Sequence, residues 1–199
     1  MRSFWADPYL WIHIAGIAAF PLSLLICLLG FAAGDPILPP WLELGLVAGA
    51  GIAPIAWMQS QKPFCIFSLL AVALRPERLS ESQRKLLAMF LVRRSPVGIG
   101  LVALVLTLIL NWVYTIAPIA EAITPISSHG LGLIVAAIGF FVSNLFVQVP
   151  FSVLLVMASS DADIAKLDPI AVDQVSKRFL VFGIPVNQIV PPIEVPKSL

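Results

Sequence analysis

Four long stretches without a charged side chain constrain this chain more than any other feature of its sequence. No Asp, Glu, Lys or Arg occurs in residues 8–34, 44–61, 95–120 or 122–160. Apolar stretches of about 18 residues or more can cross the hydrocarbon core of a bilayer as helices. Only 12% of the 199 residues are charged, against about 25% in soluble domains, so too few charges remain to cover a soluble surface. The sequence therefore predicts a polytopic membrane protein.

We expect an all-α integral membrane protein with four transmembrane helices and additional interfacial or amphipathic helices on the cytoplasmic side. The spans are placed at residues 9–31, 41–58, 97–117 and 131–157. Pro21 is expected to bend the first span near its middle. In the second span, Gly45, Gly49 and Gly51 predict a small-residue face suited to close helix contact.

The basic residues fall on one side of this topology. The loop at residues 59–95 holds seven of the twelve Lys and Arg, the N-terminus one and the tail four, whereas the connections at residues 32–40 and 118–130 hold none. Because cytoplasmic loops are enriched in Lys and Arg, both termini and the long loop are expected in the cytoplasm. The corresponding division is a membrane domain at residues 1–158 and a cytoplasmic tail at residues 159–199.

Two segments of the long loop differ in character. Residues 63–74 are apolar but too short to span, and they predict an interfacial or re-entrant segment. Ser80 and Gln83 have capping-box spacing ahead of a helical pattern of apolar residues, which predicts an amphipathic helix on the membrane surface. Its basic face would bind anionic lipid or, alternatively, a soluble acidic partner.

The tail is expected to contain one short helix. It begins at Asp168-Pro169 and ends near Arg178. Four of the sixteen residues in 184–199 are Pro, so this end is expected to be extended or disordered unless a partner holds it.

No sequence pattern indicates a catalytic centre, so no enzyme activity is expected. Motifs of phosphate-binding loops, dinucleotide-binding folds, serine hydrolases and zinc proteases are absent from the sequence. His13 and His129 are expected near opposite membrane faces and should not share a metal ion; His129 is expected to be solvated. Glu43 is treated as peripheral, and the lack of charges deep within the spans argues against ion-coupled pumps. A net charge of +1 gives no indication of nucleic-acid binding.

Three side chains are candidate contacts for a cofactor. The imidazole of His13, about one turn inside the first span, is a candidate ligand for the magnesium of chlorophyll a; the alternative is a hydrogen bond to a neighbouring helix. Asn144 and Gln148 lie on one face of the fourth span, four residues apart. They are expected to hydrogen-bond between helices, with Asn111 as a partner, or alternatively to contact a pigment or polar ligand.

Several short segments together resemble a known family. They are Arg2-Ser3-Phe4-Trp5, Asp7-Pro8-Tyr9-Leu10-Trp11-Ile12-His13, Gly34-Asp35-Pro36, Trp57-Met58-Gln59 and Ser143-Asn144-Leu145-Phe146-Val147-Gln148-Val149-Pro150. Up to about Met157, the chain is similar to the cyanobacterial family named for a low-complexity tail membrane protein. A long low-complexity tail is not present; the chain has only a short Pro-containing end. The resemblance implies a cyanobacterial integral membrane protein with the thylakoid as its expected location, and it implies no catalytic residues.

The expected function is that of a non-catalytic accessory or assembly subunit of a photosynthetic membrane complex, a photosystem being the expected partner alongside lipids. The spans would pack against a larger membrane subunit, and the tail and amphipathic helix would dock on its cytoplasmic surface. The alternative is a small-solute channel or transporter, which predicts a polar cavity lined by Asn111, Asn144 and Gln148. A membrane enzyme acting on lipid or a chlorophyll precursor would need acids or histidines clustered on one face.

Overall fold

The structure is a computed structural model that describes residues 2–190. Four helical segments are long and apolar enough to cross a membrane, namely Pro8–Phe31, Pro40–Gln61, Pro96–Ile123 and His129–Met157. The expected all-α membrane architecture is confirmed, with ends within a few residues of those predicted.

The chain forms two compact units, and the division does not follow the sequence-based boundary after residue 158. The helical unit comprises Ala15–Gln61 and Ser95–Phe151. The three-segment unit is drawn from Met1–Ile14, Lys62–Arg94 and Ser152–Leu199. The N-terminal segment, the long loop and the tail therefore fold with one another rather than as separate appendages.

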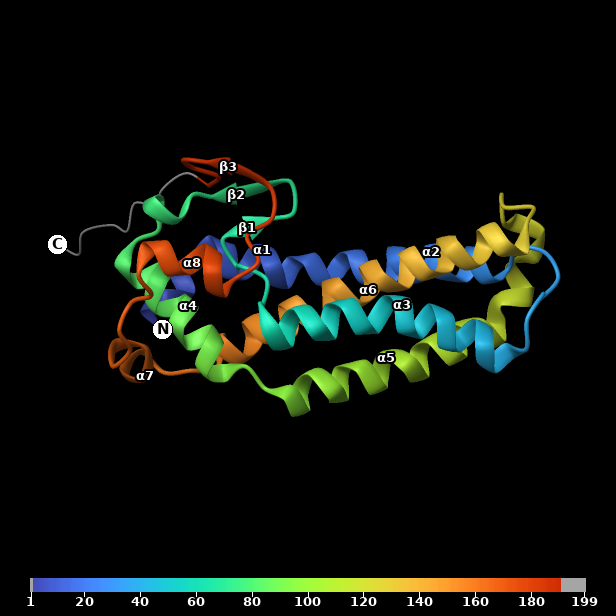
Figure 1. The fold of residues 1–199 in the computed structure, drawn as a ribbon, viewed down its shortest axis with the longest axis horizontal. Helices are drawn as coiled ribbons and strands as arrows, with labels where there is room; N and C mark the ends of the chain where they lie inside the picture. Colours follow the sequence, from blue (N-terminus) through green and yellow to red (C-terminus); the bar gives the residue numbers. More distant parts are fainter. Residues whose placement is uncertain (1, 191–199) are drawn as a thin grey trace. The chain divides into compact units, whose positions relative to one another are not determined.

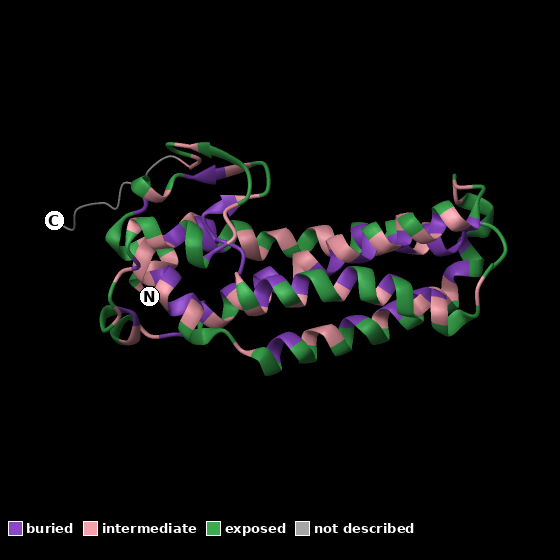
Figure 2. Cartoon of the chain, in the orientation of Figure 1, coloured by how far each residue is buried: buried purple, intermediate pink, exposed green. Residues whose placement is uncertain are grey.

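The helical unit contains the main parts of four helices, which run alongside one another in Figure 1. They are α2 (Ala19–Phe31), α3 (Pro40–Gln61), α5 (Pro96–Ile116) and α6 (His129–Met157), with the 3₁₀ segments η2 (Gly16–Ala18) and η4 (Ala117–Ile123). Figure 2 shows buried residues on the faces that these helices turn toward one another. Their outer faces expose apolar residues, among them Trp41, Trp57 and Trp112, as expected where hydrocarbon is the solvent.

The first span is interrupted at η2. Pro21 has no N–H group, so the carbonyl of Ile17 receives no helical hydrogen bond from it. The helix changes to 3₁₀ geometry over Gly16–Ala18, which separates α1 (Pro8–Ala15) from α2. Pro21 therefore breaks the regular hydrogen-bond ladder of this span near its middle.

Small residues bring α2 and α6 into close contact. A Cβ atom added at Gly139 would lie 2.7 Å from the backbone nitrogen of Cys27, and one at Gly30 would lie 2.5 Å from that of Ala136. The predicted small-residue contact on α3 is wrong for two of its three glycines, because nothing lies within 4 Å of a Cβ atom at Gly45 or Gly49. Only glycine spacing was visible in the sequence; which helix face is covered was not.

The three-segment unit combines short helices with a small sheet. Its elements are η1 (Ser3–Ala6), α1, β1 (Ser68–Leu69), β2 (Val72–Leu74), η3 (Pro76–Arg78), α4 (Glu81–Arg93), α7 (Asp161–Ala165), α8 (Val172–Arg178) and β3 (Ile184–Val186). The strand order is β1-β2-β3, with β1 antiparallel and β3 parallel to β2. Val72 is aligned with Ile184, so the tail closes onto the loop.

Residues 63–74, which were predicted to be an interfacial or re-entrant segment, bury their apolar side chains against protein. Cys65, Ile66 and Phe67 are buried in the core of the three-segment unit. The backbone is extended and pairs with the tail, because Cys65 N donates to Leu180 O at 3.0 Å. This apolar run is covered by protein.

Helix α4 forms as predicted but buries its apolar face. Ser80 and Gln83 make the expected capping box. Leu86, Leu87 and Phe90 lie in the core of the unit, where the Phe90 ring meets Phe179 edge-on at 6.2 Å. The face that was predicted to lie on the membrane surface is therefore packed against protein.

The tail contains two helices instead of one. The expected helix begins later, at Val172, and ends at Arg178 as predicted, while α7 adds a turn before it. Ile184–Val186 are extended in β3, and residues 191–199 lie outside the described residues.

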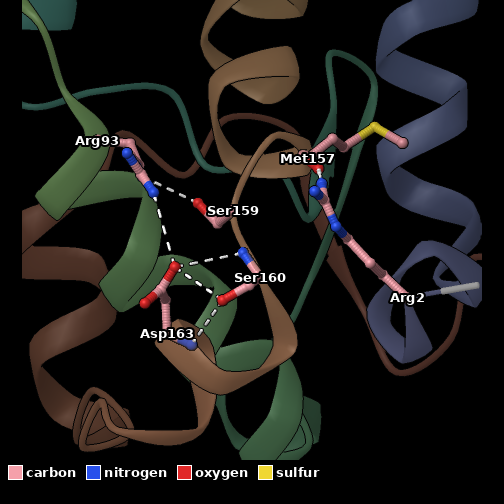
Figure 3. A network of polar contacts seen from close by, with 6 residues as sticks. All are labelled: Arg2, Arg93, Met157, Ser159, Ser160 and Asp163. Atoms are coloured by element: carbon pink, nitrogen blue, oxygen red, sulfur yellow. Dashed lines mark hydrogen bonds and ion pairs between the residues drawn. The ribbon is translucent and has the colours of Figure 1, made fainter.

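A polar network fastens the end of α4 to the start of the tail (Figure 3). Arg93 Nε donates to Ser159 Oγ at 2.9 Å, and an Arg93 guanidinium nitrogen lies 3.9 Å from a carboxylate oxygen of Asp163. Hydrogen bonds from Ser160 hold the pKa of Asp163 below its usual value. In the same view, Arg2 donates to the carbonyl of Met157, which joins the N-terminal segment to the tail.

Candidate functional site

A buried acid–histidine pair lies in the helical unit where α2 and α5 end and α3 and α6 begin. Glu43 belongs to the first turn of α3, and His129 is the first residue of α6. The side chain of Glu43 is fully buried and that of His129 is 4% exposed. The expectations that Glu43 is peripheral and His129 solvated are wrong.

The Glu43 carboxylate collects hydrogen bonds from three other elements. His129 Nε2 lies 2.9 Å from Oε1, and the backbone N–H groups of Ile37 and Leu38 also donate to Oε1, at 3.3 and 3.1 Å. The Tyr114 hydroxyl of α5 donates to Oε2 at 3.0 Å. A buried carboxylate is stable in such a place only with this kind of compensation.

The contact of the second ring nitrogen of His129, Nδ1, shows where one proton of the imidazole ring lies. Nδ1 lies 2.7 Å from the carbonyl oxygen of Ala33, which can only accept, so Nδ1 carries a proton and donates it. The remaining contact, between Nε2 and Glu43 Oε1, is satisfied when one proton lies between the two atoms. No sequence motif marks this pair, because its partners are 86 residues apart.

Polar side chains of α6 form hydrogen bonds to the other three helices of the unit. Asn144 Nδ2 donates to Gly51 O of α3 at 2.9 Å, and Gln148 Nε2 donates to Ile99 O of α5 at 3.1 Å. The Ser143 hydroxyl lies 2.8 Å from that of Ser23 on α2. All of these α6 side chains are buried, so they hold the bundle together across its interior.

Asn111 does not join this amide face. Its side chain is exposed, whereas Asn144 and Gln148 are fully buried, so the prediction that Asn111 is their partner is wrong. Within the described part of the chain, Asn144 Oδ1 has no hydrogen-bond partner. The three amides therefore do not assemble the shared polar lining that a solute channel would need.

His13 lies in the three-segment unit and is partly buried. Its Nε2 atom lies 2.8 Å from Ile66 O, and its ring meets Phe64 edge-on at 5.9 Å. Because a carbonyl only accepts, Nε2 carries a proton here, which leaves Nδ1 with the lone pair that magnesium needs. Ligation through Nε2 requires the bond to Ile66 to break. His13 as a chlorophyll ligand stays a prediction.

The described residues offer no clear site for metal ligation or for thiol chemistry. Among residues 2–190, no group of three or more His, Cys, Asp or Glu side chains could hold a metal ion. Cys27 and Cys65 are free and buried, and burial raises the pKa of the Cys65 thiol to about 11.

The three-segment unit carries every described Lys and Arg, whereas the only charged residues of the helical unit are Asp35, Glu43 and Glu121. An open groove of about 470 Å³ lies on the three-segment unit between α4 and α8. It is lined by Ala88, Leu91, Val92, Asp168, Pro169, Ile170, Ala171, Gln174 and Arg178. The groove is a candidate docking surface.

Comparison with known proteins gives a family and nothing more specific. A family model described as low-complexity tail membrane protein-like matches residues 6–191. Neither the curated proteins nor the solved structures contain a match.

Proposed function

We propose that this chain, which belongs to the low-complexity tail membrane protein-like family, is a non-catalytic accessory or assembly subunit of a larger membrane complex. The complex we propose is photosynthetic, a photosystem in a cyanobacterial thylakoid. That part is supported by the resemblance of the opening residues and of the segment Ser143–Pro150 to the cyanobacterial family.

The observation that carries the proposal is the three-segment unit. Segments separated by two pairs of spans converge on one core that includes Phe67, Phe90 and Phe179. The folded module presents an open groove in which apolar side chains of α4 face polar and charged residues of the tail, and we propose this groove as the surface that binds a protein partner. The amide nitrogens of Asn144 and Gln148 inside the helical unit already donate to backbone carbonyls of neighbouring helices, which favours a structural role over a catalytic one.

The proposed orientation places the three-segment unit in the cytoplasm. Its described residues carry eleven Lys and Arg against seven Asp and Glu, and the helical unit carries three acids and no Lys or Arg. This charge asymmetry agrees with the positive-inside rule, by which cytoplasmic segments are enriched in Lys and Arg. The Glu43–His129 end would then face the opposite compartment, the thylakoid lumen in this proposal.

Gentle purification tests the proposal. A tagged full-length chain, extracted in mild detergent, should migrate with a larger complex that contains chlorophyll. Val92→Glu places a charge in the groove at an exposed position and should release the chain from that complex. Ala162→Glu adds the same charge at an exposed position on α7, outside the groove lining, and should leave the association intact.

Three outcomes count against the proposal. A wild-type chain that migrates alone and free of pigment contradicts an accessory role. Loss of association in both variants contradicts the groove as the docking site. A complex that contains other proteins but no photosynthetic subunit contradicts the photosystem assignment and leaves the accessory role standing.

A further inference from the structure

The Glu43–His129 pair joins three parts of the helical unit that are separate in sequence, namely residues 33–43, α5 and α6. Through Ala33 O it holds the residues after α2, and through Ile37 and Leu38 it holds the connection that leads into α3. The Tyr114 hydroxyl adds α5, and His129 itself begins α6. We propose that this pair is a proton-operated clasp, which closes this end of the unit while it holds one shared proton and loosens it when a second proton arrives.

The proton count follows from the partners of each atom. With one proton between Nε2 and Oε1, every contact pairs a donor with an acceptor. A second proton neutralises the carboxylate, which then accepts weakly from Ile37, Leu38 and Tyr114, and leaves the imidazolium of His129 buried without a counter-charge. Loss of a buried ionic partner strongly destabilises the charge that remains. The clasp therefore opens on acidification.

Removal of the shared proton also breaks the arrangement. A lone pair on Nε2 would then face the carboxylate oxygen at 2.9 Å, with no hydrogen between the two atoms. The clasp is thus closed over a limited range of pH and weakened on either side. If the Glu43–His129 end faces the lumen, as in the proposed function, acidification of the lumen is the change that opens the clasp.

Few other titratable groups surround the pair. Tyr114 of α5 bonds Glu43 directly, and Cys27 of α2 is a buried neutral thiol. Asp35 in the connection before α3 and Glu121 in η4 are exposed. Since residues 15–61 and 95–151 contain no Lys or Arg, a protonated His129 is the only side-chain cation in the helical unit that can neutralise Glu43.

The same end of the unit has a second tie that does not titrate. Thr124 Oγ1, just after η4, donates to Leu29 O of α2 at 2.8 Å. Its removal should loosen this end equally at every pH. Thr124→Val is therefore a matched control for a proton-dependent tie.

Hydrogen exchange of the purified full-length chain in detergent tests the clasp. After correction for the intrinsic effect of pH, exchange of the Ile37 and Leu38 amides should rise about tenfold or more on acidification, as expected for the loss of charge-assisted hydrogen bonds. Amides in the middle of α3 should not change. In Glu43→Gln, whose neutral amide oxygen accepts as weakly as a protonated carboxyl group, the Ile37 and Leu38 amides should already exchange faster at neutral pH, so their acid-dependent rise should be reduced. In Thr124→Val the rise should remain.

Two results would overturn the clasp. The first is protection of Ile37 and Leu38 that does not change with pH in the wild-type chain. The second is an unchanged acid-dependent rise in Glu43→Gln. If that variant does not fold, the wild-type measurement and its α3 reference decide the question alone.

Discussion

The two units show opposite solutions to burying apolar side chains. In the helical unit, Trp41 and Trp57 are exposed, whereas Asn144 and Gln148 are buried and their amide nitrogens donate to backbone carbonyls. In the three-segment unit, Phe67 lies inside and charged side chains lie outside, as in a soluble domain. Similar local hydropathy therefore leads to two kinds of surface, and the surroundings decide which one forms.

The largest effect is expected from truncating the core of the three-segment unit. Phe179→Ala removes a fully buried ring packed against Phe90 and should lower the free energy of unfolding of this unit by about 4 kcal/mol. Phe182→Ala, at a 55% exposed position, should change it little. Chemical denaturation in detergent, with unfolding monitored by proteolysis, measures the free energy of unfolding of both variants. Equal sensitivity of the two variants would mean that this unit lacks the soluble-type core described here.

Widening the contact between α2 and α6 should have the next largest effect, in the helical unit alone. Gly139→Val forces side-chain atoms against the backbone of Cys27 and Ser23 and should cost about 3 kcal/mol. Gly49→Val enters open space and should be tolerated. Thermal unfolding in detergent should give a lower Tm for Gly139→Val than for Gly49→Val. A stable Gly139→Val chain would show that the helices do not approach as closely as described.

Removing one interior amide should have a moderate effect on stability and none on solute permeation. Gln148→Leu deletes the bond to Ile99 O and should destabilise the helical unit by about 1 kcal/mol. Asn111→Leu, on the exposed face, is the control and should be neutral. Solute uptake into vesicles gives the second measurement. Uptake by the wild-type chain that both substitutions abolish would restore the channel alternative.

The smallest effect concerns Asp7, before the start of α1. Burial raises the pKa of its carboxyl group, although Gln83 and the Tyr9 amide partly oppose the shift. The folded chain therefore holds this proton more tightly than the unfolded chain, and the charged form is slightly destabilising at neutral pH. Asp7→Asn should raise Tm slightly at neutral pH, and the gain should vanish as pH falls through the range in which Asp7 is protonated. A lower Tm at neutral pH would show that the charge stabilises the helix start.

The sequence predicted those features that depend on neighbours along the chain. The four spans follow from hydropathy, and the Ser80–Gln83 cap follows from a spacing of three residues. The packing of residues 63–74 against protein was not predicted, because composition does not distinguish burial by lipid from burial by protein. The candidate docking groove combines α4 with residues 168–178 and leaves no local pattern.

The Glu43–His129 pair illustrates a second limit. Each residue alone resembles a solvated group at the end of a span, and only their pairing across 86 residues makes burial possible. Glycine spacing had the same weakness, because it predicted three contact glycines on α3, of which only Gly51 packs closely, against Phe140 of α6.

The parallel pairing of β2 with β3 has a consequence for biogenesis. Residues 72–74 meet their partner strand only at residues 184–186, which follow all four spans in the chain. Until the ribosome has made that stretch and all four spans have been inserted, the loop has an open strand edge and an unfinished core. Completion of this small sheet therefore reports that all four spans have been synthesised and threaded correctly, and a partner that recognises only the finished module would ignore copies that stop earlier or are misinserted.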